Sequence, residues 1–379
     1  MFKRSIAFLL LAFVCMMPST LAAAPARNVV VMDAKTSHSF LPVRFLNGFD
    51  GNQIVWNDAA KRIEITHGST KLTMTLGQKT AVVNDRTVSL QDAPYRDNGV
   101  VYVPAQLVSQ ELGYKFTWDQ DRNAVTIDAN GASEVLPVVI RNNGKAAAKP
   151  VVSEKKTFKI GSRSFGAQMV TVDLMNPKVQ LDVVLAGNTP GKVEALGSIA
   201  KRSGAVVAIN GTFFDAYTNG SYKAPYGYIL SKGAIKMASS GDKRVIFTFD
   251  KNQLPSLISG LSFKTAYDQG RIEGGLQAGP RLLLNGKVSL NVKQEGFKDP
   301  KILTGGGARS ALGITKDHKL LLLTTGGATI PQLAEIMRQA GAYQAMNLDG
   351  GASSGLYYNG KYLTTPGRLI SNALVVKVQ

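Results

Sequence analysis

Short stretches in the first third of the chain alternate apolar and polar residues, a pattern typical of half-buried β-strands. Residues 71–76 alternate in this way, and residues 82–88 predict a hairpin with an Asn-Asp turn. Residues 105–112 instead carry apolar side chains at helical spacing, and Gly113 follows as a stop signal. Strands and short helices are therefore mixed in this part of the chain.

Three short motifs in this part recur with a constant offset of 62 residues. The pairs are 40–43 and 102–105, 54–56 and 116–118, and 63–65 and 125–127. A constant offset over three motifs indicates an internal repeat. We predict that two units, each a strand, a short helix and two further strands, build an α+β domain at residues 25–130.

Longer apolar runs separated by polar turns begin at residue 157. The expected elements are a hairpin of 169–174 and 179–185 around Asn176-Pro177, helices at 192–203 and 330–340, and a strand at 205–209 buried on both faces. Many strands with few helices favour a larger, strand-rich α+β domain at 157–379 over a doubly wound sheet. Residues 131–156, small, polar and basic in their central part, are expected to be a linker; the alternative for the apolar stretch 135–140 is a strand.

The N-terminus has the pattern of a secretory signal peptide. Two basic residues precede an apolar run at 6–17 and three alanines at 22–24, which predicts a signal peptide over 1–24. The apolar run is too short to span a bilayer well. We expect an exported protein, secreted or associated with the cell envelope, with no transmembrane segment after cleavage. The single cysteine, Cys15, lies in this segment, so the mature chain would have no disulfide.

Positive charge is concentrated in the second half of the chain. The net charge is +18; residues 25–130 carry 11 basic and 11 acidic side chains, whereas residues 157–379 carry 26 and 13. A basic excess in one domain favours an anionic partner, although a merely basic surface is the alternative. No basic stripe interleaved with aromatic residues is present, so nucleic acid is not expected. A phosphate-containing glycan suits an exported protein better.

Four polar clusters follow apolar stretches in the second half, where loops present functional groups on a rigid frame. In one of them Asp349 precedes Gly350 and Gly351, and then come Ser353 and Ser354. A glycine pair lets backbone N–H groups approach a ligand, so this turn could hold an anion beside an acid. The alternative is a tight turn capped by Asp349. The other clusters are 209–215, 277–287 and 305–314.

Other chemistries find less support in the sequence. The histidines His38, His67 and His318 lack metal-ligand spacing, and no acidic cluster has the spacing of a Mg²⁺ or Ca²⁺ site. We therefore expect neither a metal nor a cofactor. Ser353 and Ser354 lack the Gly-x-Ser-x-Gly elbow, which argues against a serine hydrolase.

The first domain carries Val-Tyr-Val-Pro-Ala at 101–105 and Leu-Gly-Tyr-Lys-Phe-Thr-Trp-Asp at 112–119. These motifs resemble the copper amine oxidase N-terminal-like stalk domain of secreted bacterial proteins. The resemblance does not imply copper. It implies a role in spacing, or in association with the cell wall.

The four clusters, in their order along the chain, resemble the phosphodiester glycosidase family, which includes N-acetylglucosamine-1-phosphodiester α-N-acetylglucosaminidase. The family's Asn-Gly-Gly-Phe-Phe-like element appears at 210–214 with Thr212 at the second glycine. Its Asn-Leu-Asp-Gly-Gly-Gly-Ser element appears at 347–353 with Ala352 at the third glycine. Its Arg-Thr-Ala-Ile-Gly element appears at 309–313. The two glycine departures affect the loop geometry, whereas the charged residues are kept.

The resemblance implies hydrolysis of a sugar-1-phosphodiester through an oxocarbenium-like transition state. Asp349 would be the carboxylate near the anomeric carbon, acting as base, nucleophile or stabiliser. Asn210 and Asp215 are further catalytic candidates, with turn capping as the alternative for both. Arginine suits phosphate because its planar fork binds two oxygens, although a structural salt bridge between Arg309 and Asp349 is an alternative. The substrate-binding candidates are Arg309, Arg368, Gly350, Gly351, Ser353, Ser354 and Gly279.

Together these features predict an exported glycosidase that releases free sugar and a phosphomonoester. The substrate is expected to be of N-acetylglucosamine type, within an envelope polymer or exopolysaccharide. The alternative is a non-catalytic envelope-polysaccharide-binding protein that keeps the fold and the basic surface.

Overall fold

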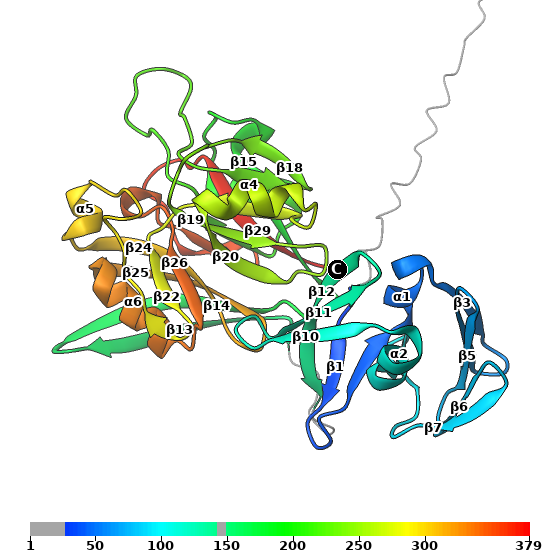
Figure 1. The fold of residues 1–379 in the computed structure, drawn as a ribbon. Helices are drawn as coiled ribbons and strands as arrows, with labels where there is room; N and C mark the ends of the chain where they lie inside the picture. Colours follow the sequence, from blue (N-terminus) through cyan, green and yellow to red (C-terminus); the bar gives the residue numbers. More distant parts are fainter. Residues whose placement is uncertain (1–26, 142–148) are drawn as a thin grey trace, which may run out of the picture.

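The computed structural model describes residues 27–141 and 149–379 (Figure 1). They form an N-terminal and a C-terminal domain in which strands predominate. The predicted signal peptide at 1–24 lies outside the described residues. None of the helices in the described ranges is long and apolar enough to cross a membrane.

Two sheets form the N-terminal domain. One has the strand order β10-β11-β12-β1-β2-β9-β8 and the other β3-β4-β5-β6-β7. Strand β1 pairs in parallel with β12, and the remaining described pairs of these sheets are antiparallel. The strands are β1 Val30–Asp33, β2 Ser39–Pro42, β3 Gln53–Asn57, β4 Arg62–His67, β5 Thr70–Thr75, β6 Thr80–Val83, β7 Arg86–Ser89, β8 Tyr95–Asp97, β9 Val100–Pro104, β10 Lys115–Asp119, β11 Ala124–Ala129 and β12 Ala132–Arg141. The helices are α1 Val43–Leu46, the 3₁₀ turn η1 Phe49–Gly51 and α2 Ala105–Leu112.

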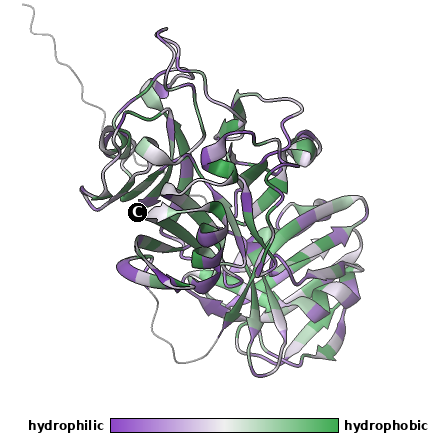
Figure 2. Cartoon of the chain, turned by 90° about the vertical axis from the view of Figure 1, so that its left-hand side faces the viewer, coloured by the Kyte–Doolittle hydropathy of each residue, from purple (hydrophilic) through white to green (hydrophobic). Residues whose placement is uncertain are grey.

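Local sequence signals explain several of these elements. Helix α2 begins after Pro104 and ends at Gly113, whose φ of 74° is left-handed, so the predicted helix and its stop are confirmed. The predicted hairpin is confirmed too, because β6 and β7 pair around Asn84 and Asp85, both with positive φ. Figure 2 shows hydrophobic and hydrophilic residues interleaved along the strands, as one-sided burial requires.

The expected linker at 131–156 is corrected by the structure. Strand β12 occupies Ala132–Arg141 and pairs with both β11 and β1, while β13 begins at Val151. The apolar side chains of β12, such as Leu136 and Val138, are buried in the N-terminal core. Their burial makes a strand more stable than a solvated spacer. Residues 142–148 lie outside the described part of the chain.

Three sheets form the C-terminal domain, with the orders β13-β14-β25-β24-β26-β22-β23, β15-β29-β16-β27-β28 and β18-β17-β21-β19-β20. The strands are β13 Val151–Ile160, β14 Arg163–Asp173, β15 Val179–Leu185, β16 Val207–Asn210, β17 Ile229–Ser231, β18 Ala234–Met237, β19 Val245–Phe249, β20 Pro255–Ser259, β21 Gly274–Gln277, β22 Arg281–Leu284, β23 Lys287–Val288, β24 Gly307–Ile314, β25 Lys319–Ala328, β26 Gln344–Asn347, β27 Leu356–Tyr358, β28 Lys361–Thr364 and β29 Asn372–Val378. The helices are η2 Ala186–Asn188, α3 Leu196–Ser203, α4 Gly260–Asp268, α5 Pro300–Leu303, α6 Ile330–Gln339 and η3 Gly351–Ser353.

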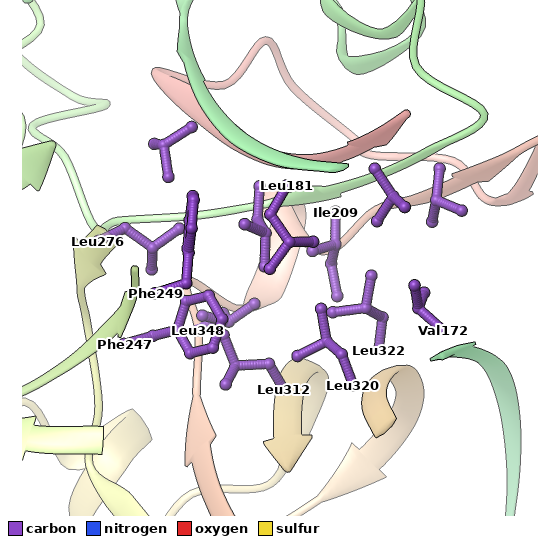
Figure 3. Close-up of a cluster of buried hydrophobic side chains, with 14 of the residues drawn as sticks. Val172, Leu181, Ile209, Phe247, Phe249, Leu276, Leu312, Leu320, Leu322 and Leu348 are labelled. Atoms are coloured by element: carbon purple, nitrogen blue, oxygen red, sulfur yellow. The ribbon is translucent and has the colours of Figure 1, made fainter. Parts of the chain in front are cut away.

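One hydrophobic core is shared by all three sheets of this domain. Leu312 and Leu322 reach it from the first sheet, Ile209 from the second, and Phe247 and Leu276 from the third (Figure 3). The opposite faces are covered by helices: α6 on the first sheet, α3 on the second and α4 on the third. This arrangement explains why β16 and most of β24 are buried on both faces.

The hairpin expected at 169–185 does not form, although both of its strands do. Strand β14 pairs with β13 and β25, whereas β15 pairs with β29 in another sheet. The turn at Asn176-Pro177 therefore carries the chain from one sheet to the next. Side chains from both strands meet in the shared core, so the strands pack face to face rather than side by side. The expected helices at 192–203 and 330–340 correspond to α3 and α6, the latter with a Thr329–Gln332 capping box.

Buried polar contacts join the two domains. The Nε2 atom of His318 lies 3.0 Å from the carbonyl oxygen of Asn123 and 3.1 Å from that of Val138. Burial lowers the pKa of His318, which favours the neutral ring. Nearby, the Tyr343 hydroxyl donates to the Asp121 carboxylate at 2.8 Å.

Helix α4 offers a test of this packing. Phe263 is fully buried and packs against Tyr228 with 4.3 Å between ring centroids, whereas Leu261 on the same helix is 60% exposed. We expect Phe263→Ala to lower the free energy of unfolding by about 3–5 kcal/mol, because it removes a buried ring. Leu261→Ala should change it by less than about 1 kcal/mol. Urea unfolding followed by near-ultraviolet circular dichroism measures both; equal losses would contradict the described packing.

Candidate active site

Three of the four polar clusters meet at the loop after β26. The backbone N–H of Leu348 donates to the carbonyl of Ser310 at 2.8 Å, and that of Asp349 donates to the carbonyl of Gly211 at 3.0 Å. These bonds tie the loop to β24 on one side and to the end of β16 on the other. Segments about 140 residues apart in sequence thus hold the Asp349 backbone in place.

The side chain of Asn210 completes this attachment. Its amide nitrogen donates to the carbonyl of Asp349 at 2.6 Å, while its amide oxygen accepts from the Ser310 hydroxyl at 2.7 Å and the Gly355 N–H at 3.0 Å. All of these contacts lie within the protein and connect three segments. The geometry therefore gives Asn210 a structural role that reaches further than a turn cap, while the predicted catalytic role stays a prediction.

Arg309 is also held by the protein itself. It is 3% exposed, and its guanidinium donates to the backbone carbonyls of Ala328, Lys301 and Gly305 at 2.7–2.9 Å. Burial lowers its pKa. The salt bridge with Asp349 considered from the sequence is absent from the described ion pairs. Its remaining nitrogen, Nη1, faces Gly350, since a Cβ added there would lie 3.8 Å from it.

The two glycines after Asp349 have different reasons to be glycine. Gly350 has an ordinary extended backbone, but a Cβ there would stand 3.0 Å from the carbonyl oxygen of Ala308. Gly351 has a φ of 60°, which favours glycine, and opens the short 3₁₀ turn η3. The turn places the Ser353 hydroxyl on the Asp349 carboxylate.

The carboxyl group of Asp349 is enclosed by protein, although the residue as a whole is half-buried. Burial raises the pKa of Asp349 to about 7, against the opposing effects of the Ser353 hydroxyl, the Gly350 N–H and the charge of Arg368. Near neutral pH this group can therefore both gain and lose a proton. Such a carboxyl group is suited to acid–base or nucleophilic work.

Arg368 lies beside this carboxyl group on the loop between β28 and β29. The loop is attached to the Asp349 turn, because the Gly367 N–H donates to the carbonyl of Ala352 at 2.7 Å. The guanidinium of Arg368 donates to the hydroxyl of Tyr217 at 2.9 Å and lies 4.8 Å from the centre of that ring. The positive charge of Arg368 therefore lies next to both the Asp349 carboxyl group and the exposed ring of Tyr217.

Two residues that the sequence did not single out belong to this group. Tyr217 is 77% exposed and lies on the long loop after β16. The hydrogen bond and charge of Arg368, followed by the charge of Lys301, lower the pKa of Tyr217, while Asp349 acts in the opposite direction. Lys301 is exposed on α5, and its carbonyl is a partner of Arg309. Three tyrosines in one polar loop, at 217, 222 and 226, were a usable sequence signal; Lys301 had none.

Gly279 and Asp215 support the loops rather than the centre of the site. Gly279 exchanges hydrogen bonds with Asn347, through its N–H at 2.8 Å and its carbonyl at 2.8 Å. The Asp215 carboxylate accepts from the N–H groups of Tyr217 and Thr218. It therefore caps a turn, which is the alternative weighed from the sequence. Its effect is to shape the loop that carries Tyr217.

Several buried polar atoms in these loops have no hydrogen-bond partner within the described residues. They include the hydroxyls of Thr212 and Ser354 and the amide oxygen of Asn347. Buried polar groups are normally paired, so such atoms mark places where a polar ligand or water completes the bonding. All three belong to the predicted clusters. In contrast, no group of three histidine, aspartate or glutamate side chains in the described ranges could hold a metal ion.

Comparisons with known proteins agree with this arrangement. Residues 203–377 match the family model of the phosphodiester glycosidases, and residues 29–127 match that of the copper amine oxidase N-terminal domain. The curated proteins contain no match to the chain. A hypothetical protein from Synechocystis has a similar structure, with a TM-score of 0.54 and 15% identity over 93% of this chain and 99% of the other.

The catalytic domain of zebrafish N-acetylglucosamine-1-phosphodiester α-N-acetylglucosaminidase, auto-inhibited by its pro-peptide, is also similar. Its TM-score is 0.52 with 20% identity, over 62% of this chain and 86% of the other. At these identities the likeness concerns the fold. The family match, however, takes in all four polar clusters, including Asp349. The C-terminal part of this chain is therefore similar to the phosphodiester glycosidase family, and the part before it is similar to the copper amine oxidase N-terminal domain.

Proposed function

We propose that the C-terminal domain hydrolyses a sugar-1-phosphodiester to free sugar and a phosphomonoester. The observation that carries this proposal is the Asp349 carboxyl group, with its pKa raised to about 7, beside Arg368 and Arg309, which form no ion pair with a carboxylate of the described residues. A carboxylate next to a phosphate-binding patch is what cleavage at the anomeric carbon needs.

Arg368 and Lys301 are the proposed phosphate ligands. The charges of both act on the Tyr217 hydroxyl, so a phosphate oxygen near that hydroxyl would meet two positive charges. Because the Tyr217 ring is exposed, it can turn aside when an anion takes its hydrogen bond from Arg368. Arg309 contributes Nη1 beside Gly350, while its other nitrogens stay hydrogen-bonded to backbone carbonyls.

Asp349 would act on the sugar in its ionised form. As a base it would remove a proton from the attacking water, and as a nucleophile it would attack the anomeric carbon itself. The bond that breaks joins the anomeric carbon to the phosphate oxygen. Its electron pair leaves with the phosphomonoester, a weak base that needs little help from a general acid.

For the substrate we propose a glycan with N-acetylglucosamine-type sugars in an envelope polymer or exopolysaccharide. The support is the predicted signal peptide together with the basic surplus of residues 157–379. A non-catalytic binder of such a polymer is the second candidate, because Thr212 and Ala352 replace two family glycines.

Asp349→Asn tests the proposed chemistry. We expect release of N-acetylglucosamine from UDP-N-acetylglucosamine, or from N-acetylglucosamine 1-(methyl phosphate), to fall by several orders of magnitude, because the ionisable group is lost. Asp268→Asn, an exposed carboxylate on α4, removes the same charge and should leave the rate unchanged. Turnover of Asp349→Asn within about tenfold of wild type would exclude Asp349 as the key acid. Binding of these compounds by the wild type without turnover would favour the second candidate.

The raised pKa of Asp349 predicts a pH dependence. The ratio kcat/KM should rise with pH through about 7, because the ionised carboxylate is the active form. Stability should change in the opposite sense. A carboxyl group whose pKa is raised by folding stabilises the fold below its unfolded pKa of about 4, and that contribution is lost as pH rises through about 7. Asp349→Asn should therefore unfold at higher urea than wild type at pH 8, but not at pH 4. A kcat/KM that falls through pH 7 would instead make Asp349 a general acid.

The cationic groups can be tested one at a time. Lys301→Ala and Arg368→Ala should each lower kcat/KM by about 10- to 100-fold, the value of a charge-assisted hydrogen bond. Lys298→Ala removes an equal charge from an exposed position three residues away and serves as the control. Steady-state kinetics at fixed ionic strength measures all three variants. Equal effects at Lys298 and Lys301 would mean that general charge, rather than a phosphate site, governs the rate.

A further inference from the structure

A cavity of about 470 Å³ lies in the N-terminal domain, lined entirely by residues of that domain. Its volume falls in the range of pockets that bind small ligands. It opens between helix α2, strand β10 and the loops before β2 and β8. No role in spacing or attachment by itself requires such a cavity.

One wall of the cavity is aromatic. Phe116 and Trp118 both line it, and they lie two residues apart on β10, so their rings stand on the same face of the sheet. Trp118 is 42% exposed. Behind the rings, Val125 and Val138 are buried and form the floor. An exposed indole backed by a rigid apolar floor offers a flat surface for a ligand with an apolar face.

The facing wall is made of uncharged amides. Gln106 and Gln110 both line the cavity and lie one turn apart on α2, which places them on one face of that helix. Gln91, on the loop before β8, closes one end. Within the described residues the side-chain amides of these three glutamines make no hydrogen bond to the protein. Each can donate and accept at once.

The cavity contains one pair of ionisable side chains, which contact each other. The Nδ1 atom of His38 contacts the Oδ2 atom of Asp92, and both residues line the cavity and are partly buried. The remaining lining residues include four serines and no lysine or arginine. An anionic ligand therefore finds no lysine or arginine among the lining residues, in contrast to the surroundings of Asp349.

We propose that this cavity, defined by Trp118, Phe116, Gln106 and Gln110, is a binding site for an uncharged glycan. A pyranose ring has an apolar face that can stack on Trp118, and hydroxyl and acetamido groups that match amides which both donate and accept. A proline-rich peptide would also stack on aromatic rings, but it offers only acceptors on its backbone and leaves most of the amide donors unpaired. The glycosidase assignment of the second domain favours a glycan as well, and to that extent the choice of ligand rests on the proposed function.

The test uses the full mature chain and isothermal titration calorimetry with two probes, an N-acetylglucosamine hexamer and cellohexaose. We expect at least one of them to bind. Trp118→Ala should weaken that binding by at least tenfold, because stacking of a sugar depends on the aromatic ring. Trp118→Phe should keep it within about threefold. The double variant Gln106→Ala/Gln110→Ala should lose about tenfold or more. Gln78→Ala, an exposed amide in a turn of the same domain, is the control and should bind as wild type does.

Intrinsic fluorescence gives an independent readout. The chain has two tryptophans, Trp56 and Trp118, and Trp56 packs against the core of the N-terminal domain. Stacking of a sugar on Trp118 should shift the emission to shorter wavelength, because it excludes water from the exposed indole.

Three outcomes would overturn the proposal. The first is no binding of either hexamer, and the second is binding that Trp118→Ala leaves intact. The third is Trp118-dependent binding of a proline-rich decapeptide in place of the hexamers, which would make the cavity a peptide site. Asp349→Asn separates this proposal from the enzymatic one: it should bind the hexamers as wild type does. Loss of binding in that variant would place the ligand in the C-terminal domain.

Discussion

The side-chain amide of Asn210 is the interaction on which the site depends. One neutral group connects the end of β16, the Ser310 hydroxyl on β24 and the backbone on both sides of the Asp349 turn. The Ser310 hydroxyl and the Gly355 N–H both donate to the amide oxygen of Asn210. A side chain of similar size without that oxygen would therefore leave these two buried donors unpaired. Because the link is uncharged, the loop is held without an ion pair to Asp349. The carboxyl group can then keep the raised pKa that burial gives it.

The same principle applies to the positive side of the site. Arg309 is fixed by three backbone carbonyls, and Arg368 by a phenol. Neutral partners fix a guanidinium without cancelling its charge, whereas a carboxylate would do both. The positive potential around Asp349 therefore remains available to an anion. The lining of the N-terminal cavity differs, since it holds no lysine or arginine and its amides are uncharged.

Sequence patterns predicted those parts of the fold that local physics determines. Helix α2, helix α6 and the turn at Asn84-Asp85 follow from apolar spacing, capping residues and turn chemistry. The exchange of sheets between β14 and β15 could not be predicted this way, because both strands are apolar and only distant partners decide their pairing. For strand β12 the apolar stretch at 135–140 left a strand possible, but its pairing with β1, over 100 residues earlier in the chain, could not be predicted from local sequence.

In the site, the glycine-rich turn after Asp349 could be predicted from the sequence, because its backbone conformation needs those glycines. The structural roles of Asn210 and Arg309 could not be predicted, since their partners are mostly backbone groups, which every residue has. Lys301 is one of many lysines in a basic domain, and only the fold brings it to Tyr217.

Strand β29 has a consequence for how the chain acquires its shape. It follows every other described strand in sequence, yet it occupies an interior position in its sheet, between β15 and β16. During synthesis those two strands emerge from the ribosome long before the strand that joins them. Until then β15 lacks its partner strand and one edge of β16 is unpaired, so the domain stays open to chaperones and to self-association. Its cooperative collapse must await the arrival of residues 372–378.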